Sequence, residues 1–150
     1  MRIIPMSQQE CSALLRRVPI GRLACSLDNQ PYVVPVAFSY EPDCIYVFST
    51  LGQKIDWMRQ NPKVCLQVDE IGDASNWFSV IVTGTYLELR EPQYAAQREH
   101  ARELLGQHTE WWLNPLAERR NQASDLTIKP VFFRIDTVST SGLRAVPEAE

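Results

Sequence analysis

The sequence has no excess of positive charge, no long apolar run and no cysteine motif for a metal ion. Its 150 residues hold 15 Lys and Arg against 18 Asp and Glu, so the formal net charge is 15 − 18 = −3. Proteins that bind nucleic acid or membrane surfaces concentrate positive charge, so we expect neither partner. No run approaches the roughly 20 apolar residues that cross a bilayer. The amino terminus is too short in its apolar part for a signal peptide, and the expected location is the cytoplasm.

Cysteine and histidine are both scarce. The four cysteines contain no CxxC pair and no histidine at metal-ligand spacing, so no metal site is expected. Cys25, Cys44 and Cys65 fall among apolar neighbours, and we interpret them as buried reduced thiols, with metal-binding and catalytic roles as the alternatives. His100 is interpreted as solvated and His108 as a partner of a helix carboxyl end. No residue has the pattern of an obligatory acid, base or nucleophile, so the catalytic residues stay unassigned.

What the sequence does contain is a succession of strand patterns with short links. A capping box, Ser7 with Glu10, opens a helix. The expected helices span 7–17, 52–60 and 92–106, with a further short helix possible at 111–116. The expected strands span 21–27, 32–40, 44–50, 63–70, 77–89 and 130–142. This order predicts a mainly β fold with peripheral helices, in which six antiparallel strands close into a small barrel.

Two of the expected strands carry irregular residues. Positions 33–38 are apolar on both faces, which indicates a central strand covered on both sides, yet Pro35 lies in its middle. Proline cannot donate to a ladder, so we expect a bulge or an unpaired stretch there, with backbone groups left for a ligand. Gly84 predicts a bulge or bend in the strand 77–89. The acidic cluster at 69, 70 and 73 is interpreted as a solvated loop.

The corner after the strand 44–50 is unusually polar. Ser49 and Thr50 bring two hydroxyls, Gly52 lets a ligand approach the backbone, and Lys54 adds a charge. The first turn of the following helix has unpaired N–H groups and a positive dipole end. Two interpretations remain open: a cradle for a phosphate, or a capped helix with a solvated lysine. The glycine spacing is not that of a Walker loop.

Three segments resemble a known family in order and spacing. They are "GRLACSLDNQPYVVPVAFSY", "IYVFSTLGQKIDWMRQNPKVCLQVDE" and "NWFSVIVTGTYLEL", which cover about half the chain. They are similar to the FMN-binding split-barrel family of pyridoxamine 5'-phosphate oxidase, and closest to its branch of nitroimidazole-resistance proteins. The resemblance implies a six-stranded antiparallel split β-barrel over residues 1–142, followed by a loose tail at 143–150. It also implies a homodimer with flavin mononucleotide (FMN) in a groove between the protomers.

The resemblance assigns cofactor contacts to particular residues. Three of them, Ser49, Thr50 and Lys54, would hold the phosphate, and the strand around Pro35 would lie against the ring edge. Trp77 and Ser79 would reach the flavin from the partner subunit. The full set is Pro35, Val36, Ser49, Thr50, Gln53, Lys54, Trp77 and Ser79. One tryptophan of the pair Trp111 and Trp112 would pack in the core or the dimer contact, and the other would wall the flavin pocket.

This chain also departs from the oxidase. Gln53 stands where the oxidase has an arginine, and Ser79 where it has a glutamine. The carboxy-terminal motif that holds pyridoxal phosphate is not visible, so a vitamin B6 oxidase is not expected. The resemblance implies an FMN-dependent oxidoreductase that passes hydride or electrons from a nicotinamide cofactor to a small acceptor, such as a nitroaromatic or a quinone. The alternatives are a flavin or haem carrier, a redox sensor, or a deazaflavin-binding module.

Overall fold

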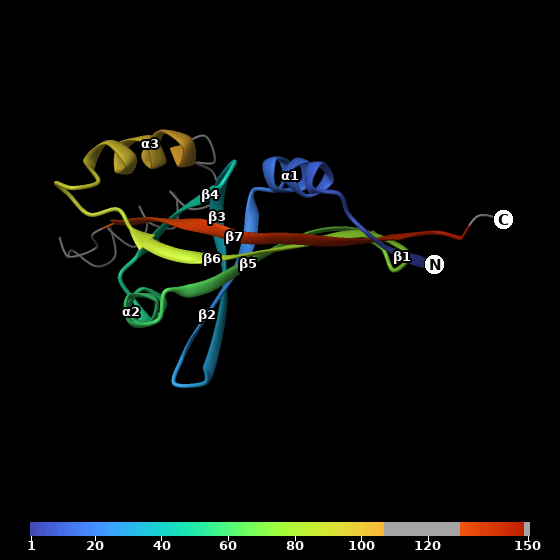
Figure 1. Cartoon of the computed structure of the whole chain (residues 1–150), viewed down its shortest axis with the longest axis horizontal. Coiled ribbons are helices and arrows are strands. Elements are labelled where there is room, and N and C mark those ends of the chain that lie inside the picture. Colours follow the sequence, from blue (N-terminus) through green and yellow to red (C-terminus); the bar gives the residue numbers. More distant parts are fainter. Residues whose placement is uncertain (107–129, 149–150) are drawn as a thin grey trace, which may run out of the picture.

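A single antiparallel sheet forms the frame of the protein, which a computed structural model describes over residues 1–106 and 130–148 (Figure 1). Its strands are β1 (Arg2–Pro5), β2 (Ile20–Leu27), β3 (Gln30–Glu41), β4 (Cys44–Thr50), β5 (Lys63–Asp73), β6 (Asn76–Glu88) and β7 (Pro130–Val146). The helices are α1 (Gln8–Arg17), α2 (Gln53–Gln60) and α3 (Ala95–Gly106). The strand order is β1-β7-β4-β3-β2-β5-β6, and β6 also pairs with β7. The strands β2 to β7 therefore form a closed ring of paired strands, which confirms the predicted six-stranded barrel.

The structure adds a strand and lengthens another. β1 was not expected, and it pairs with the carboxy-terminal end of β7 from Arg2 opposite Val146 to Pro5 opposite Leu143. Residues 143–146 therefore belong to β7 rather than to a loose tail, because β1 lies on one side of them and the start of β6 on the other. The sequence pattern misses this pairing because its two partners are nearly the whole chain apart.

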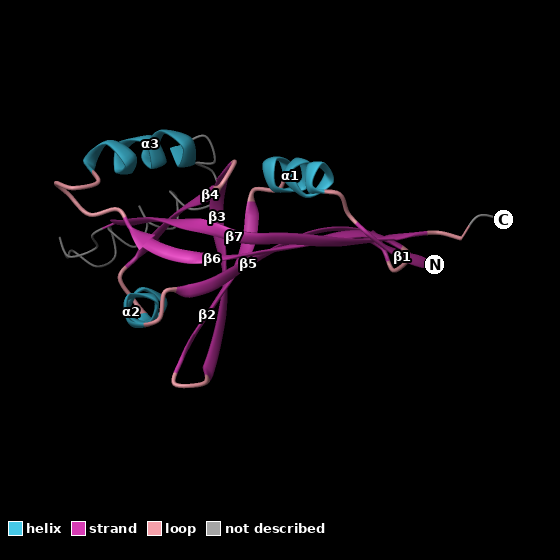
Figure 2. Cartoon of the chain, in the orientation of Figure 1, coloured by secondary structure: helices cyan, strands magenta, loops and turns pink. Residues whose placement is uncertain are grey.

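The core lies inside the barrel and is covered by two helices. Side chains from all six barrel strands meet there with Leu14 and Leu15 of α1 and with Ile55 and Met58 of α2. The predicted capping box begins α1, since Ser7 Oγ accepts from the Glu10 amide at 3.1 Å and Glu10 accepts from the Ser7 amide at 3.0 Å. A smaller cluster packs α3 onto the outer faces of β4 and β7, beside the barrel (Figure 2).

Gly84 interrupts the β6–β7 ladder, as predicted. The register shifts between Thr83 and Gly84, which is the signature of a bulge. A side chain at this position would overlap the backbone oxygen of Asp136 and the side chain of Ile135. Glycine is required here because β7 approaches the backbone too closely for a Cβ atom.

Pro35 is irregular in a different way from the one expected. The β2–β3 ladder runs through it without a bulge, with Arg22 opposite Pro35. The interruption lies on its other side, where β3 pairs with β4 only from Phe38 to Glu41. The prediction of a strand covered on both faces was wrong, because Val33 is 63% exposed. The β2–β3 hairpin extends beyond the barrel, which leaves that face uncovered within one chain (Figure 1).

Other predictions had mixed outcomes. The acidic positions are not a loop: Asp69 and Glu70 lie in β5 and pair with Arg22 and Arg17. Of the four free cysteines, Cys11 and Cys25 are buried, whereas the other two are half-buried. The predicted helix at 111–116, the two adjacent tryptophans and His108 lie outside the described residues. No helix in the described ranges is long and apolar enough to span a membrane.

Candidate functional site

β3 and β4 separate just beyond Phe38 and Val47. The register of the last paired residues, Phe38 with Val47, would place Val36 opposite Ser49 and Pro35 opposite Thr50 if it continued. It does not continue, because β4 pairs from there only with β7, up to Thr50 opposite Pro130. Two strands with unpaired backbone edges therefore flank one opening. Four of the eight predicted site residues lie on its two rims.

Ser49 is the buried polar residue of the described chain. The residue is 6% exposed, and the other described residues buried to this degree are apolar apart from the phenol hydroxyl of Tyr46. The hydroxyl donates to the backbone oxygen of Thr50 at 3.1 Å. A serine hydroxyl has two lone pairs besides its proton, and no donor to them is recorded within the described residues. The structure therefore holds an acceptor in a position that the barrel pattern would otherwise fill with a hydrophobic residue.

α2 begins beside this opening without a side-chain cap. Its N-cap residue is Gly52, in extended backbone, and no side chain bonds to the first helical amides. α1, by contrast, begins with a full capping box. A Cβ atom at Gly52 would meet nothing within 4 Å, so the space next to these amides is open. Within the described residues no side chain caps the helix start, and its positive dipole end faces that space.

Lys54 and Gln53 lie in the first turn of α2. Gln53 is exposed, whereas Lys54 is half-buried. Burial raises the pKa of the Cys25 thiol, and the Lys54 ammonium offsets part of that rise. This coupling places the charge of Lys54 beside β2, on which α2 packs. The polar corner thus combines Ser49, Thr50, the uncapped amides and one ammonium group.

The other end of α2 is anchored by a half-buried carboxylate. Arg59 donates to both oxygens of Glu88, at 2.8 and 3.1 Å, and Tyr86 and Arg90 donate to the same group. Burial acts to raise the pKa of Glu88, but these hydrogen bonds outweigh it and lower the pKa to about 2. The anchor holds the short helix, and with it the polar corner, against β6.

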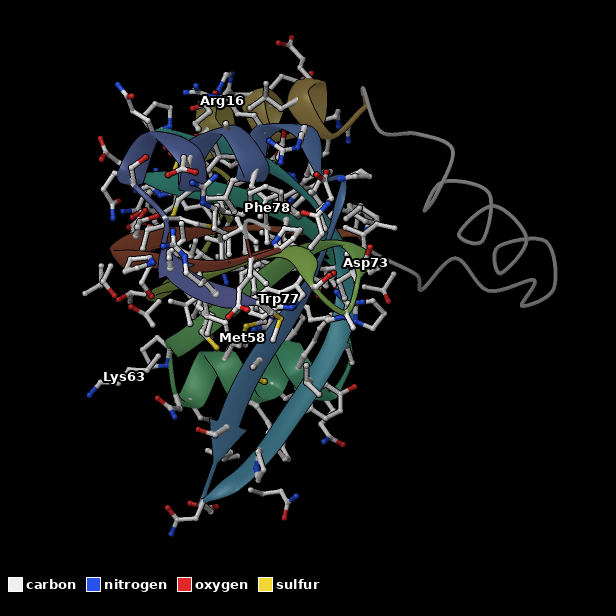
Figure 3. The ribbon with its side chains drawn as sticks, turned by 90° about the vertical axis from the view of Figure 1, so that its right-hand side faces the viewer. Arg16, Met58, Lys63, Asp73, Trp77 and Phe78 are labelled. Atoms are coloured by element: carbon white, nitrogen blue, oxygen red, sulfur yellow. The ribbon has the colours of Figure 1, made fainter. Side chains whose placement is uncertain are left out.

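Trp77 and Ser79 do not join the corner within one chain. Both lie at the start of β6, four strands away from β4 in the order β4-β3-β2-β5-β6. At about 4.8 Å per strand this is roughly 19 Å along the curved sheet. Trp77 is half-buried beside the β5–β6 turn, which Asp73 marks (Figure 3). Within one chain the predicted residues therefore form two groups, one at the polar corner and the adjoining opening and one at the start of β6.

Ser79 belongs to a polar network that the sequence did not reveal. Gln67 Nε2 donates to Ser79 Oγ at 3.2 Å and to Asp69 Oδ2 at 3.0 Å. Arg22 Nη1 donates to the same carboxylate oxygen at 3.0 Å. One sequence pattern could have indicated it. Gln67 and Asp69 alternate with the buried residues of β5, so both side chains lie on the outer face of the sheet.

An apolar cavity of about 500 Å³ also lies on the barrel. It is lined by residues of β2, β5 and β6 and by Val138 of β7, and it includes the half-buried Cys65. Ile81 of β6 is exposed on the same strands, and Val33 is exposed on the neighbouring β3. The exposed walls of the cavity are mostly apolar, and the lining includes Cys25, whose thiol is coupled to the Lys54 ammonium group. The cavity marks an uncovered apolar face rather than a phosphate site.

His100 lies on α3, away from the corner. Its Nε2 is 2.5 Å from a carboxylate oxygen of Glu41, and its ring meets the edge of Tyr46. The side chain is partly exposed, but it is paired rather than simply solvated. Among the residues that the structure describes, no group of three His, Cys, Asp or Glu side chains could hold a metal ion.

Comparison with known proteins identifies the family. The sequence profile described as pyridoxamine 5'-phosphate oxidase matches residues 7–144. The chain belongs to this family. A curated relative, an uncharacterized protein of Rhizobium meliloti, is 39% identical over 145 residues, which cover 93% of each chain.

Solved structures with a similar fold confirm the predicted split-barrel fold. A FAD-binding protein of Mesorhizobium loti is 40% identical, covers 98% of this chain and 99% of its own, and superposes with a TM-score of 0.79. A FAD-binding protein of Mycobacterium smegmatis is 23% identical over 93% of this chain and 97% of its own, with a TM-score of 0.64. A Bacteroides thetaiotaomicron structure assigned to 5-nitroimidazole antibiotic resistance is 17% identical over 95% and 87%, with a TM-score of 0.70. The last two likenesses concern the fold alone.

Proposed function

We propose that the protein binds a flavin nucleotide, FMN, with its phosphate at the polar corner and its ring along the opening between β3 and β4. The observation that carries this proposal is the separation of β3 from β4 beside the uncapped start of α2. Support also comes from the Mesorhizobium loti relative, which is named for FAD binding and is 40% identical.

The residues present fit such a ligand. A phosphate dianion is stabilised by hydroxyl and amide donors and by a cation, which Ser49, Thr50, the first turn of α2 and Lys54 supply. The unpaired backbone of β3 near Val36 can donate to and accept from the polar edge of a flat heteroaromatic ring. Gln53 brings a neutral side chain in place of an arginine, so the phosphate would be held by one positive side chain and by dipoles.

The site would be completed by a second copy of the chain. A two-fold dimer buries the same face of both protomers, so it can bring Trp77 and Ser79 of one copy to the opening of the other. The outer face of β2, β5 and β6 suits this contact, because it carries the apolar cavity and the exposed Ile81 and Val138. Covering it would remove apolar surface from water.

The chemistry would be that of an oxidoreductase. A bound flavin supplies hydride acceptance from a reduced nicotinamide and electron donation to a small acceptor, such as a nitroaromatic or a quinone. The chain's own residues hold the phosphate, align the ring through the β3 backbone and exclude water with the partner's tryptophan. Hydride transfer to a flavin requires no protein acid or base.

The decisive experiment is the absorption spectrum of the freshly purified protein, followed by the mass of the ligand released on denaturation. We expect absorption maxima of a flavin and a released ligand with the mass of FMN. A ligand with the mass of FAD would show that the bound nucleotide is FAD, with the polar corner still as its phosphate site. A Soret band, or a colourless protein that does not bind added flavin, would refute the proposal. Consumption of NADH or NADPH with a panel of acceptors then separates an enzyme from a carrier. Bound flavin that neither nicotinamide reduces would refute the reductase.

A further inference from the structure

The network on the outer face fixes the orientation of one amide group. An aspartate carboxylate can only accept hydrogen bonds, so the Gln67 atom 3.0 Å from Asp69 Oδ2 must be the amide nitrogen. The ion pair of Asp69 with Arg22, also at 3.0 Å, holds that carboxylate in place. The second hydrogen of the Gln67 amide points to Ser79 Oγ at 3.2 Å. Both hydrogens of the amide are therefore used within the sheet.

Two groups are left available as a result. The Gln67 carbonyl, Oε1, has no hydrogen-bond partner among the described residues. Ser79 Oγ accepts from Gln67, so its own proton is directed elsewhere, and no acceptor for it is recorded in the described chain. The network thus presents a hydrogen-bond acceptor and a donor next to each other. Both side chains are half-buried, and Arg22 of β2 lies opposite both Gln67 of β5 and Pro35 of β3.

An adjacent acceptor and donor complement a ligand edge that carries an N–H beside a carbonyl oxygen. The pyrimidine edge of an oxidised isoalloxazine ring has this arrangement, since N3–H is its one ring N–H and carbonyls flank it. We propose that Gln67 Oε1 accepts from flavin N3–H and that Ser79 donates to the neighbouring carbonyl, across the dimer. Arg22 and Asp69 are positioning residues that keep the amide from turning over. This inference rests on the proposed flavin site.

The same donor and acceptor pair would also suit the carboxamide of a nicotinamide. The flavin edge is favoured because Ile81, opposite Gln67 in the β5–β6 ladder, lies on the apolar face through which the two copies would meet, so the pair would face the opening of the other copy. One test distinguishes the two ligands: methylation of flavin N3 removes the N–H from the flavin and leaves a nicotinamide unchanged.

The experiment measures dissociation constants of FMN and 3-methyl-FMN by fluorescence titration of the apoprotein. We compare the wild type with Gln67→Leu, and with Gln97→Leu on α3 as a matched control. The wild type and the control should prefer FMN over 3-methyl-FMN by about 3- to 10-fold, the value of one net hydrogen bond. Gln67→Leu should lose this preference. A Gln67→Leu variant that keeps the preference would overturn the inference, as would one that instead raises the KM for the nicotinamide alone.

Two further variants separate positioning from folding. Ser79→Ala, a smaller change, should weaken both flavins equally by about 3- to 10-fold and keep the N3 preference. Asp69→Asn replaces the acceptor with a group that can also donate, which frees the Gln67 amide to turn; it should reduce the N3 preference without abolishing flavin binding. A preference that is unchanged in folded Asp69→Asn protein contradicts the positioning role. If the folded wild type binds no flavin at all, the proposed function fails; if it binds both flavins equally, only this inference fails.

Discussion

Arg59 of α2 and Glu88 of β6 form a bidentate ion pair, with Nε to Oε1 at 2.8 Å and Nη2 to Oε2 at 3.1 Å. The two residues are 29 positions apart in the sequence, and their pairing sets how the short helix lies against the barrel. Because the polar corner is the first turn of the same helix, this contact positions the candidate site from its far end.

Stability should therefore depend on Glu88 and on pH. The folded pKa of about 2 lies below the ordinary value of 4.5, so the stabilisation is fully present above about pH 4.5 and is lost as the pH falls toward 2. We expect Glu88→Gln to lower the free energy of unfolding by about 2–3 kcal/mol at pH 7. Urea unfolding at several pH values measures this free energy for the variant and the wild type. The difference between variant and wild type should shrink in acid; a constant difference would contradict the linkage. Glu91→Gln, at an exposed and longer ion pair, is the control and should change stability by less than about 0.5 kcal/mol.

The ammonium group of Lys54 should contribute to flavin binding. Lys54→Ala removes the one positive side chain that we place at the phosphate, and it should weaken FMN binding by roughly 1.5–3 kcal/mol. The loss should be smaller at high salt, because screening already weakens the wild type there. Arg102→Ala, which removes an exposed cation of α3, is the charge-matched control. Equal dissociation constants for Lys54→Ala and the wild type would remove Lys54 from the phosphate site.

Gly84 should tolerate no side chain. Gly84→Ala places a Cβ atom against the backbone of β7, which cannot move as a flexible side chain would. We expect a loss of about 1–3 kcal/mol or more in the free energy of unfolding, as for other overpacked cores. Thermal or urea unfolding gives the value. Gly106→Ala, where the added atom meets nothing within 4 Å, is the control. A Gly84→Ala protein as stable as the control would show that the bulge can relax.

The outer face should control the oligomeric state. Ile81 is 44% exposed on β6, in register with Gln67. Ile81→Asp would place a charge in an apolar contact, and burying it unpaired is costly, so we expect a monomer in analytical ultracentrifugation and a loss of flavin affinity together. Ala96→Asp, on exposed α3, should leave both unchanged. A dimer that persists in Ile81→Asp would place the contact on another face.

Local patterns account for the elements that were predicted correctly. The capping box at Ser7 and the alternation along β5 act over a few residues, so they can be read without the fold. The order and length of the strands also predicted closure into a small barrel, and the family resemblance identified it as a split barrel. β1, the four residues of β7 beyond 142 and the true nature of the Pro35 interruption escaped prediction, because each depends on which distant strand lies alongside.

By itself, the sequence determined the succession of strands and helices, the glycine at the bulge and the polar composition of the corner after β4. Only the tertiary structure decided that β3 and β4 separate at that corner, that Arg59 reaches Glu88, and that Gln67 orients toward Ser79. The physical reason is that strand pairing and side-chain hydrogen bonds join residues that are distant along the chain. Their geometry exists only once the barrel has closed.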